Sequence, residues 1–210
     1  MTAGPSFAES SVTRGGRRPA EADIVYFSVD VEASGPAPGL YNLVSIGAVP
    51  VSRQGDVWRP DERGFYTELK PIGGAFDAEA MAVHGITRRH LEERGTPAER
   101  AMADLREFVV ERCGEARRRA VFVGHNAGFD WSYIGYYFTL AGIPNPFGYK
   151  ALDIKSLAMG RLRIGWFDTS KENLERLLPQ IPREDKRQAH RADYDALYQA
   201  HILCALLNLP

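Results

Sequence analysis

The sequence YFSVDVEASG, residues 26–35, places two acidic residues at the end of a strand-forming stretch. Residues 24–29 are mostly β-branched or aromatic, which favours a strand. Successive side chains of a strand point to opposite faces, so Asp30 and Glu32 project in the same direction, about 7 Å apart. Two carboxylates in this arrangement can share one metal ion or hold two. The D-x-E pattern alone is common, and an exposed surface position is its alternative interpretation.

Two further segments carry acids beside apolar stretches. Asp130 ends the segment VFVGHNAGFD, residues 121–130, and Asp195 lies five positions after His190 in HRADYDALYQAH, residues 190–201. Burying several carboxylates side by side is too costly unless cations lie among them. Hard divalent cations such as Mg²⁺ or Mn²⁺ take oxygen ligands. The three segments therefore predict a two-metal site for phosphodiester chemistry, with His190 beside it.

Local structure leaves alternatives open for these residues. Asp130 stands where a strand gives way to a helix, so its other possible role is to cap the helix N-terminus. Asp193 competes with Asp195, because an acid in the first turn of a helix is favourable by the helix dipole alone. His190 and Asp195 are not on one helix face, so we expect His190 in the loop before the last helix.

The pattern of the whole chain predicts an α/β domain. Five strands are expected, at residues 24–29, 43–51, 64–69, 120–124 and 151–154. The first three, separated by turn-rich segments, form a plausible antiparallel meander. Helices are expected at 78–83, from a cap at Thr87, and at 97–113, 130–141, 155–160, 170–178 and 192–207. The order predicts a mixed five-stranded sheet with helices on both faces.

Composition limits the class of protein. The chain has 210 residues, 44% hydrophobic and 25% charged, and a formal net charge of −1, which fits a globular domain without a strong overall field toward nucleic acid. Cys113 and Cys204 form no disulfide framework, so we expect a reduced, cytoplasmic environment. No apolar run is long enough to span a membrane. Residues 1–22 are expected to be a flexible tail and residues 23–210 the catalytic domain.

The ordered motifs DVE, HNAGFD and H-x-x-x-x-D resemble the three exonuclease motifs of the DEDDh family of 3′–5′ exonucleases. This family includes the proofreading subunits of bacterial DNA polymerase and ribonuclease T, and the similarity runs from about residue 24 to residue 207. The resemblance implies a ribonuclease H-like fold. It also implies that Asp30, Glu32, Asp130 and Asp195 are metal ligands and His190 is the general base, which favours Asp195 over Asp193.

The resemblance extends to residues near the substrate. EAMAVHGIT, residues 79–87, is similar to the family segment whose Glu and His approach the substrate, here Glu79 and His84. From the residues alone, His84 and Gly85 would only form a turn. The family usually has Thr or Ser directly after the glutamate of the first motif, and this chain has Ala33. A substrate contact through the backbone of Ala33 would survive this difference, whereas a contact through a hydroxyl would not.

The implied reaction is hydrolysis of terminal phosphodiester bonds at the 3′ ends of single-stranded DNA or RNA, with release of nucleoside monophosphates. Two Mg²⁺ or Mn²⁺ ions would flank the scissile phosphate. Two alternatives belong to other classes: a non-catalytic nucleic-acid-binding or adaptor domain, and a phosphodiesterase acting on small nucleotides. The sequence neither distinguishes DNA from RNA nor identifies a protein partner or a homodimer.

Overall fold

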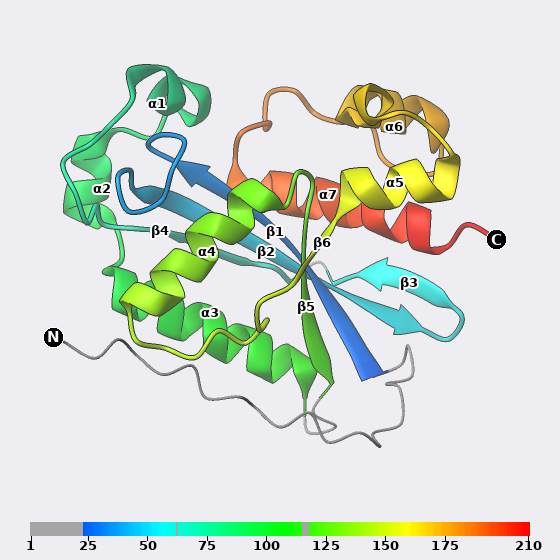
Figure 1. The fold of residues 1–210 in the computed structure, drawn as a ribbon, viewed down its shortest axis with the longest axis horizontal. Coiled ribbons are helices and arrows are strands. Elements are labelled where there is room, and N and C mark those ends of the chain that lie inside the picture. The colour runs from blue at the N-terminus through cyan, green and yellow to red at the C-terminus, as the bar shows by residue number, and fades with distance from the viewer. Residues whose placement is uncertain (1–22, 62, 115–117) are drawn as a thin grey trace, which may run out of the picture.

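The computed structural model describes residues 23–61, 63–114 and 118–210, and the predicted tail over 1–22 lies outside these ranges. Its centre is a six-stranded mixed sheet in the order β3-β2-β1-β5-β6, with β4 also paired to β2 (Figure 1). The strands are β1 (Ile24–Ala33), β2 (Leu43–Gln54), β3 (Val57–Pro60), β4 (Phe65–Glu68), β5 (Arg119–Gly124) and β6 (Ala151–Asp153). The mixed sheet predicted from the sequence is confirmed.

The pairing differs from the expected meander in one respect. β2 is antiparallel to β1 and long enough for two short strands to pair with its two halves, β4 with the first and β3 with the second. The prediction of five strands missed β3, which is only four residues long and follows the turn at Gly55. β5 runs parallel to β1, and β6 runs parallel to β5.

Helices cover both faces of the sheet, as predicted (Figure 1). One face packs against α3 and α4, and the other against α5, α6 and α7. The helices are α1 (Ala78–His84), α2 (Arg88–Arg94), α3 (Ala98–Cys113), α4 (Gly128–Leu140), α5 (Ile154–Leu162), α6 (Lys171–Leu177) and α7 (Ala192–Leu207). Among the described residues, none of these helices has the length and apolar character needed to cross a membrane.

Local signals explain where the short helices begin and end. Thr87 caps α2 by accepting a hydrogen bond from the backbone N–H of His90, as its position in the sequence predicted. α1 ends at Gly85, whose φ of 70° lies in the left-handed region that glycine adopts without steric cost. The segment from α1 to α2 is therefore fixed largely by its own residues.

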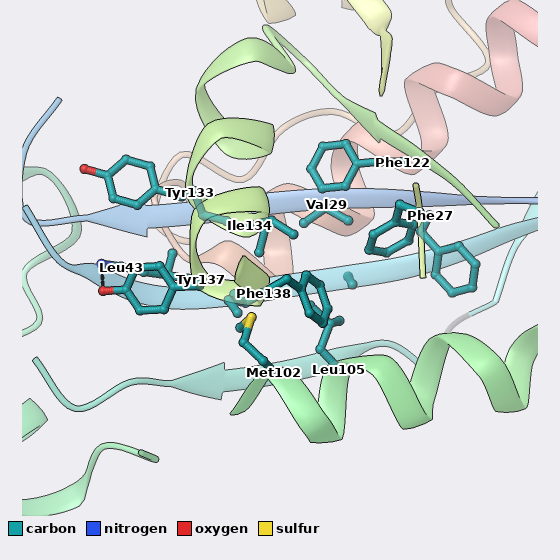
Figure 2. Packing of buried hydrophobic residues seen from close by; sticks show 14 of the residues in the cluster. Phe27, Val29, Leu43, Met102, Leu105, Phe122, Tyr133, Ile134, Tyr137 and Phe138 are labelled. Carbon is teal, nitrogen blue, oxygen red and sulfur yellow. Dashed lines mark hydrogen bonds between the residues drawn. The ribbon is translucent and has the colours of Figure 1, made fainter. Parts of the chain in front are cut away.

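The core on the α3 and α4 side fixes the position of α4 (Figure 2). Tyr133 and Tyr137 are both fully buried there, and each removes a large apolar ring from water. The Tyr137 hydroxyl accepts a hydrogen bond from the backbone N–H of Leu43 at 2.9 Å, and the Tyr133 hydroxyl donates to the carbonyl of Gly35 at 2.7 Å. These bonds tie α4 to the ends of β1 and β2, beside the acidic segment.

On the opposite face, α7 approaches β2 unusually closely at Gly47. A Cβ atom at Gly47 would lie 2.0 Å from the carbonyl oxygen of Ala192 and 2.6 Å from the backbone nitrogen of Asp193. Gly47 is also the antiparallel partner of Asp30 in β1. The absence of a side chain at Gly47 therefore allows the start of α7 to lie directly over the acidic part of the sheet.

We expect Gly47→Ala to lower the free energy of unfolding by about 3 kcal/mol, because backbone atoms on both sides must move apart. It should also reduce any activity that depends on Asp195, which moves with the start of α7. Urea denaturation measures the first effect. Gly135→Ala in α4 is the matched control, since among the described residues its added methyl would contact nothing within 4 Å. Equal stability of the two variants would contradict this account of the close approach.

Candidate active site

The first two acids of the site come from the end of β1. Alternation along the strand turns Val29 and Val31 toward the α3 and α4 side, and turns Asp30 and Glu32 toward α7. Glu32 is buried and Asp30 is partly accessible. In Figure 1, the half of β1 that carries them lies beside the N-terminal ends of α4 and α7. The expected projection of both carboxylates to one face is what the structure has.

The third acid, Asp130, reaches the same place from the first turn of α4. Its Oδ1 accepts a hydrogen bond from the backbone N–H of Val31 at 3.0 Å. The hydrogen-bonded pairing of β1 with β5 ends at Ser28 and Val123, so the N–H of Val31 has no partner in β5. The Asp130 carboxylate takes that place. Asp130 is not the N-cap of α4, a position held by Ala127. Asp130 is 5% exposed, and its carboxylate lies close enough to Asp30 to raise the pKa of that acid.

The fourth acid and the histidine come from the start of α7. His190 lies in the loop before the helix with a φ of 65°, and Asp195 lies one turn inside it, as expected from their spacing. The Asp195 Oδ2 atom accepts a hydrogen bond from the backbone N–H of His190 at 2.7 Å. A left-handed conformation at a residue other than glycine costs about 1 kcal/mol or more, and is often kept at functional sites. Asp193 is instead exposed to solvent in part and paired with Arg191.

These residues converge although their motifs lie far apart in the sequence. Ligand atoms of Glu32, His190 and Asp195 all lie within 4.8 Å of one another. Asp30 lies close enough to Asp130, Asp195 and Glu32 for these acids to raise its pKa. Asp130 also raises the pKa of Glu32. The structure therefore brings together all five residues that the sequence singled out for catalysis.

Burial and like charge raise the pKa values of three of these acids. The pKa of Asp30 is raised well above its usual value, first by burial and then by Asp130, Asp195 and Glu32. Burial, with Asp195 and Asp130 nearby, raises the pKa of Glu32 to about 8. Burial also raises the pKa of Asp130 to about 7. The ammonium group of Lys171 opposes each of these shifts.

Such a group of acids has the chemistry of a site for hard divalent cations. Every carboxylate offers oxygen ligands, and positive charge among them would remove the repulsion that raises their pKa values. A ring nitrogen of His190 lies within 4.8 Å of carboxylate oxygens of both Glu32 and Asp195. The residues present therefore fit the divalent metal ions that the sequence predicts.

Two polar residues of the site were not found from the sequence. Gln199 is buried on α7, donates from Nε2 to Asp30 Oδ1 at 2.5 Å, and accepts at Oε1 from the backbone N–H of His125 at 2.9 Å. It lies one helical turn after Asp195, a spacing that could have indicated it. Lys171, the first residue of α6, pairs with Asp195 Oδ1. No pattern in the sequence indicated Lys171.

Of the three residues expected near the substrate, Ala33 and His84 lie at the edge of the site. Ala33 is the last residue of β1 and is buried, next to a register shift that follows Glu32. His84, at the end of α1, is half-buried, and burial and the nearby His190 lower its pKa while the backbone of Ala33 opposes this shift. Glu79 is exposed in the first turn of α1. Ala33 and His84 therefore lie beside the acidic cluster.

The raised acid pKa values predict how stability depends on pH without metal. Between pH 4.5, the usual value for glutamate, and about 8, the folded chain holds a proton on Glu32 that the unfolded chain has lost. Stability in chelator should therefore be highest at the acidic end and fall as pH rises toward 8. At about 1.4 kcal/mol for each pKa unit, the rise from roughly pH 5.5 to the Glu32 pKa of about 8 should cost on the order of 3 kcal/mol. This corresponds to roughly 6–12 °C in melting temperature.

Thermal melts in chelator from pH 5.5 to 8.5 measure this effect. Saturating Mg²⁺ should restore stability more at pH 8 than at pH 6, because metal ligation requires the ionised acids. Glu32→Gln should flatten the decline, since it removes one titrating group from the cluster. A metal-free melting temperature that rises with pH over this range would show that the acids do not repel one another in the folded state.

Comparison with known proteins agrees with this arrangement. The model of the RNase T exonuclease family matches residues 27–203. The 3′–5′ DNA exonuclease Cap18 of Escherichia coli is 38% identical over 178 residues, which cover 85% of this chain and 89% of that protein. Ribonuclease T of Cronobacter sakazakii is 29% identical over 184 residues, which cover 86% of this chain and 80% of that protein.

Solved structures give the same fold. The nuclease domain of 3′hExo, a DEDDh family member bound to rAMP, superposes with a TM-score of 0.66 at 12% identity and covers 86% of this chain and 89% of that one. The DEDDh exonucleases use divalent metal ions, which the acidic cluster fits. This chain belongs to the same exonuclease family as ribonuclease T, and it is a 3′–5′ exonuclease with the ribonuclease H-like fold.

Proposed function

We propose that Asp30, Glu32, Asp130 and Asp195 hold two Mg²⁺ or Mn²⁺ ions and that His190 is the general base. The observation that carries this proposal is the convergence of four carboxylates from three distant segments beside one histidine. Bound divalent ions lower the pKa of a coordinated water and stabilise the leaving 3′ oxygen. His190 accepts a proton from the attacking water, a role for which histidine is well suited near neutral pH.

The contacts of these residues support their assigned roles. Gln199 and the backbone N–H of Val31 orient the carboxylates of Asp30 and Asp130, so each presents a fixed set of free oxygen lone pairs. Asp195 Oδ2 holds the backbone of His190 in its left-handed conformation. This bond connects the proposed base, His190, to one proposed metal ligand, Asp195. His190 itself remains exposed to solvent, from which a substrate would enter.

We propose single-stranded 3′ ends as the substrate, with DNA preferred over RNA. The relative named as a DNA exonuclease is more similar to this chain than the ribonuclease T of Cronobacter sakazakii, at 38% against 29% identity. Glu79, His84 and the backbone of Ala33 would contact the terminal nucleotide. With alanine at position 33, that residue offers only its backbone and a methyl group, so no hydroxyl there would select for a ribose.

We assign the activity to residues 23–210 and the reaction to the cytoplasm. The motifs and the matched family region both fall within these residues. Cys113 and Cys204 are buried free thiols, which suits a reducing compartment.

Digestion of matched 3′-labelled and 5′-labelled DNA and RNA oligomers, with Mn²⁺ or with chelator, tests this function. The 5′-labelled DNA should give a ladder that shortens from the 3′ end, and the 3′-labelled DNA should release labelled mononucleotide at once. Asp195→Asn protein purified in the same way controls for a contaminating nuclease. Internal cleavage, or activity that persists in chelator, would contradict the proposal. Faster digestion of RNA would overturn only the preference for DNA.

A further inference from the structure

A lysine lies inside the acidic cluster. Lys171 reaches it from the start of α6, and its ammonium group contacts Asp195 Oδ1. Its side chain is 23% exposed and that of Asp195 only 4%, so the pair is largely shielded from water. Asp30 also acts on Lys171 electrostatically. Lys171 therefore offsets part of the negative charge of four neighbouring carboxylates.

The contacts of Asp195 leave no oxygen without a donor from the chain. Oδ1 faces the ammonium of Lys171, and Oδ2 accepts the backbone N–H of His190 at 2.7 Å. The same carboxylate contributes to the group whose ligand atoms lie within 4.8 Å of one another. A divalent cation bound there would therefore meet the Lys171 ammonium beside it, and two positive charges in a half-buried site repel each other.

The Lys171 ammonium group has other favourable contacts within reach. The lysine stem has four flexible carbons, so the ammonium can move while the backbone of α6 stays in place. The ring of Tyr198 lies 6.0 Å from its Nζ, within reach of a cation–π contact. Glu184, whose side chain is 5% exposed and pairs with Lys186, also attracts Lys171 electrostatically. Displacement from Asp195 would thus leave the ammonium near an aromatic face and another carboxylate.

We propose that Lys171 is the resident counter-cation of the site, which occupies Asp195 in the metal-free enzyme and is displaced by the metal ion. This inference rests on the proposed assignment of Asp195 as a metal ligand. Two consequences follow. The lysine stabilises the metal-free fold, because it reduces repulsion among the acids, and it weakens metal binding, because the ion must displace it. Lys171 thereby sets the metal concentration at which the enzyme becomes loaded.

Calorimetric titration with Mn²⁺ alone, without nucleic acid, tests the competition. Lys171→Met keeps most of the flexible stem of the side chain and removes the charge, and we expect it to bind Mn²⁺ about tenfold more tightly than the wild type. Its melting temperature in chelator should fall by several degrees, and saturating Mn²⁺ should close that gap. Lys155→Met is the matched control, because the Lys155 ammonium lies over the Trp166 ring at 4.1 Å, and its Mn²⁺ affinity should equal that of the wild type.

A second neutral variant, Lys171→Gln, keeps a hydrogen-bond donor for Asp195 and carries the test if Lys171→Met does not fold without metal. Tighter Mn²⁺ binding in the Lys171 variants, with the control unchanged, supports the inference. Unchanged or weaker binding overturns it and leaves the proposed function intact, provided that the wild type binds Mn²⁺. A wild type that does not bind Mn²⁺ would refute the metal assignment, and the inference with it.

Discussion

Asp195→Asn is expected to lower the rate of 3′-end trimming by about 10³-fold or more, while the protein stays folded. The substitution removes the charge with which a buried carboxylate, 4% exposed, would bind a divalent ion. Loss of several kcal/mol of transition-state stabilisation from a metal site corresponds to rate losses of this size, at about 1.4 kcal/mol for each factor of ten. Asparagine keeps an oxygen that can accept the backbone N–H of His190, so the start of α7 should retain its conformation.

Single-turnover rates on a 5′-labelled oligonucleotide, with circular dichroism melts of the same samples, measure both parts of this prediction. Asp193→Asn is the matched control, because it makes the same chemical change two residues away on the same helix, where the side chain pairs with Arg191. Its rate should stay within about threefold of the wild type, as expected for an exposed ion pair. Comparable losses of rate in both variants would show that Asp195 has no larger role in the reaction than Asp193.

Replacing His190 by asparagine is expected to lower the rate by roughly 10²- to 10⁴-fold, the usual contribution of a general base. Asparagine adopts the left-handed conformation more readily than most residues, so the φ of 65° at this position should not be strained further. The side chain of asparagine does not accept a proton near neutral pH, and only the chemistry of the position changes.

Metal affinity separates a base from a ligand in this variant. His190→Asn should bind Mn²⁺ within about threefold of the wild type, because a general base acts on the attacking water and not on the ion, whereas Asp195→Asn loses a charged oxygen ligand and should bind it much more weakly. His90→Asn is the matched control, since His90 lies on α2 at an exposed position and pairs with Glu68 at 2.5 Å. A His190→Asn rate within tenfold of the wild type would remove His190 from the mechanism. A collapse of metal binding would instead make it a ligand.

Features that depend only on neighbouring residues in the sequence were predictable. The alternation of β1 turns Asp30 and Glu32 to one face whatever the rest of the chain does. The loop position of His190 and the helical position of Asp195 follow from their spacing. The short strand β3 was missed because four residues after a tight turn give too little pattern, and its pairing depends on the length of β2.

The sequence alone determined the helices and strands other than β3, the chemical type of the site and, through the order of its motifs, the family. The tertiary structure decided which side chains outside the motifs meet the acids. Gln199 and Lys171 belong to the site because α7 packs across the sheet at Gly47 and the start of α6 lies beside it. Such contacts join residues as far apart as Asp30 and Gln199, 169 positions along the chain. Local spacing fixes the direction of a side chain, but only the packing of distant elements determines what it meets.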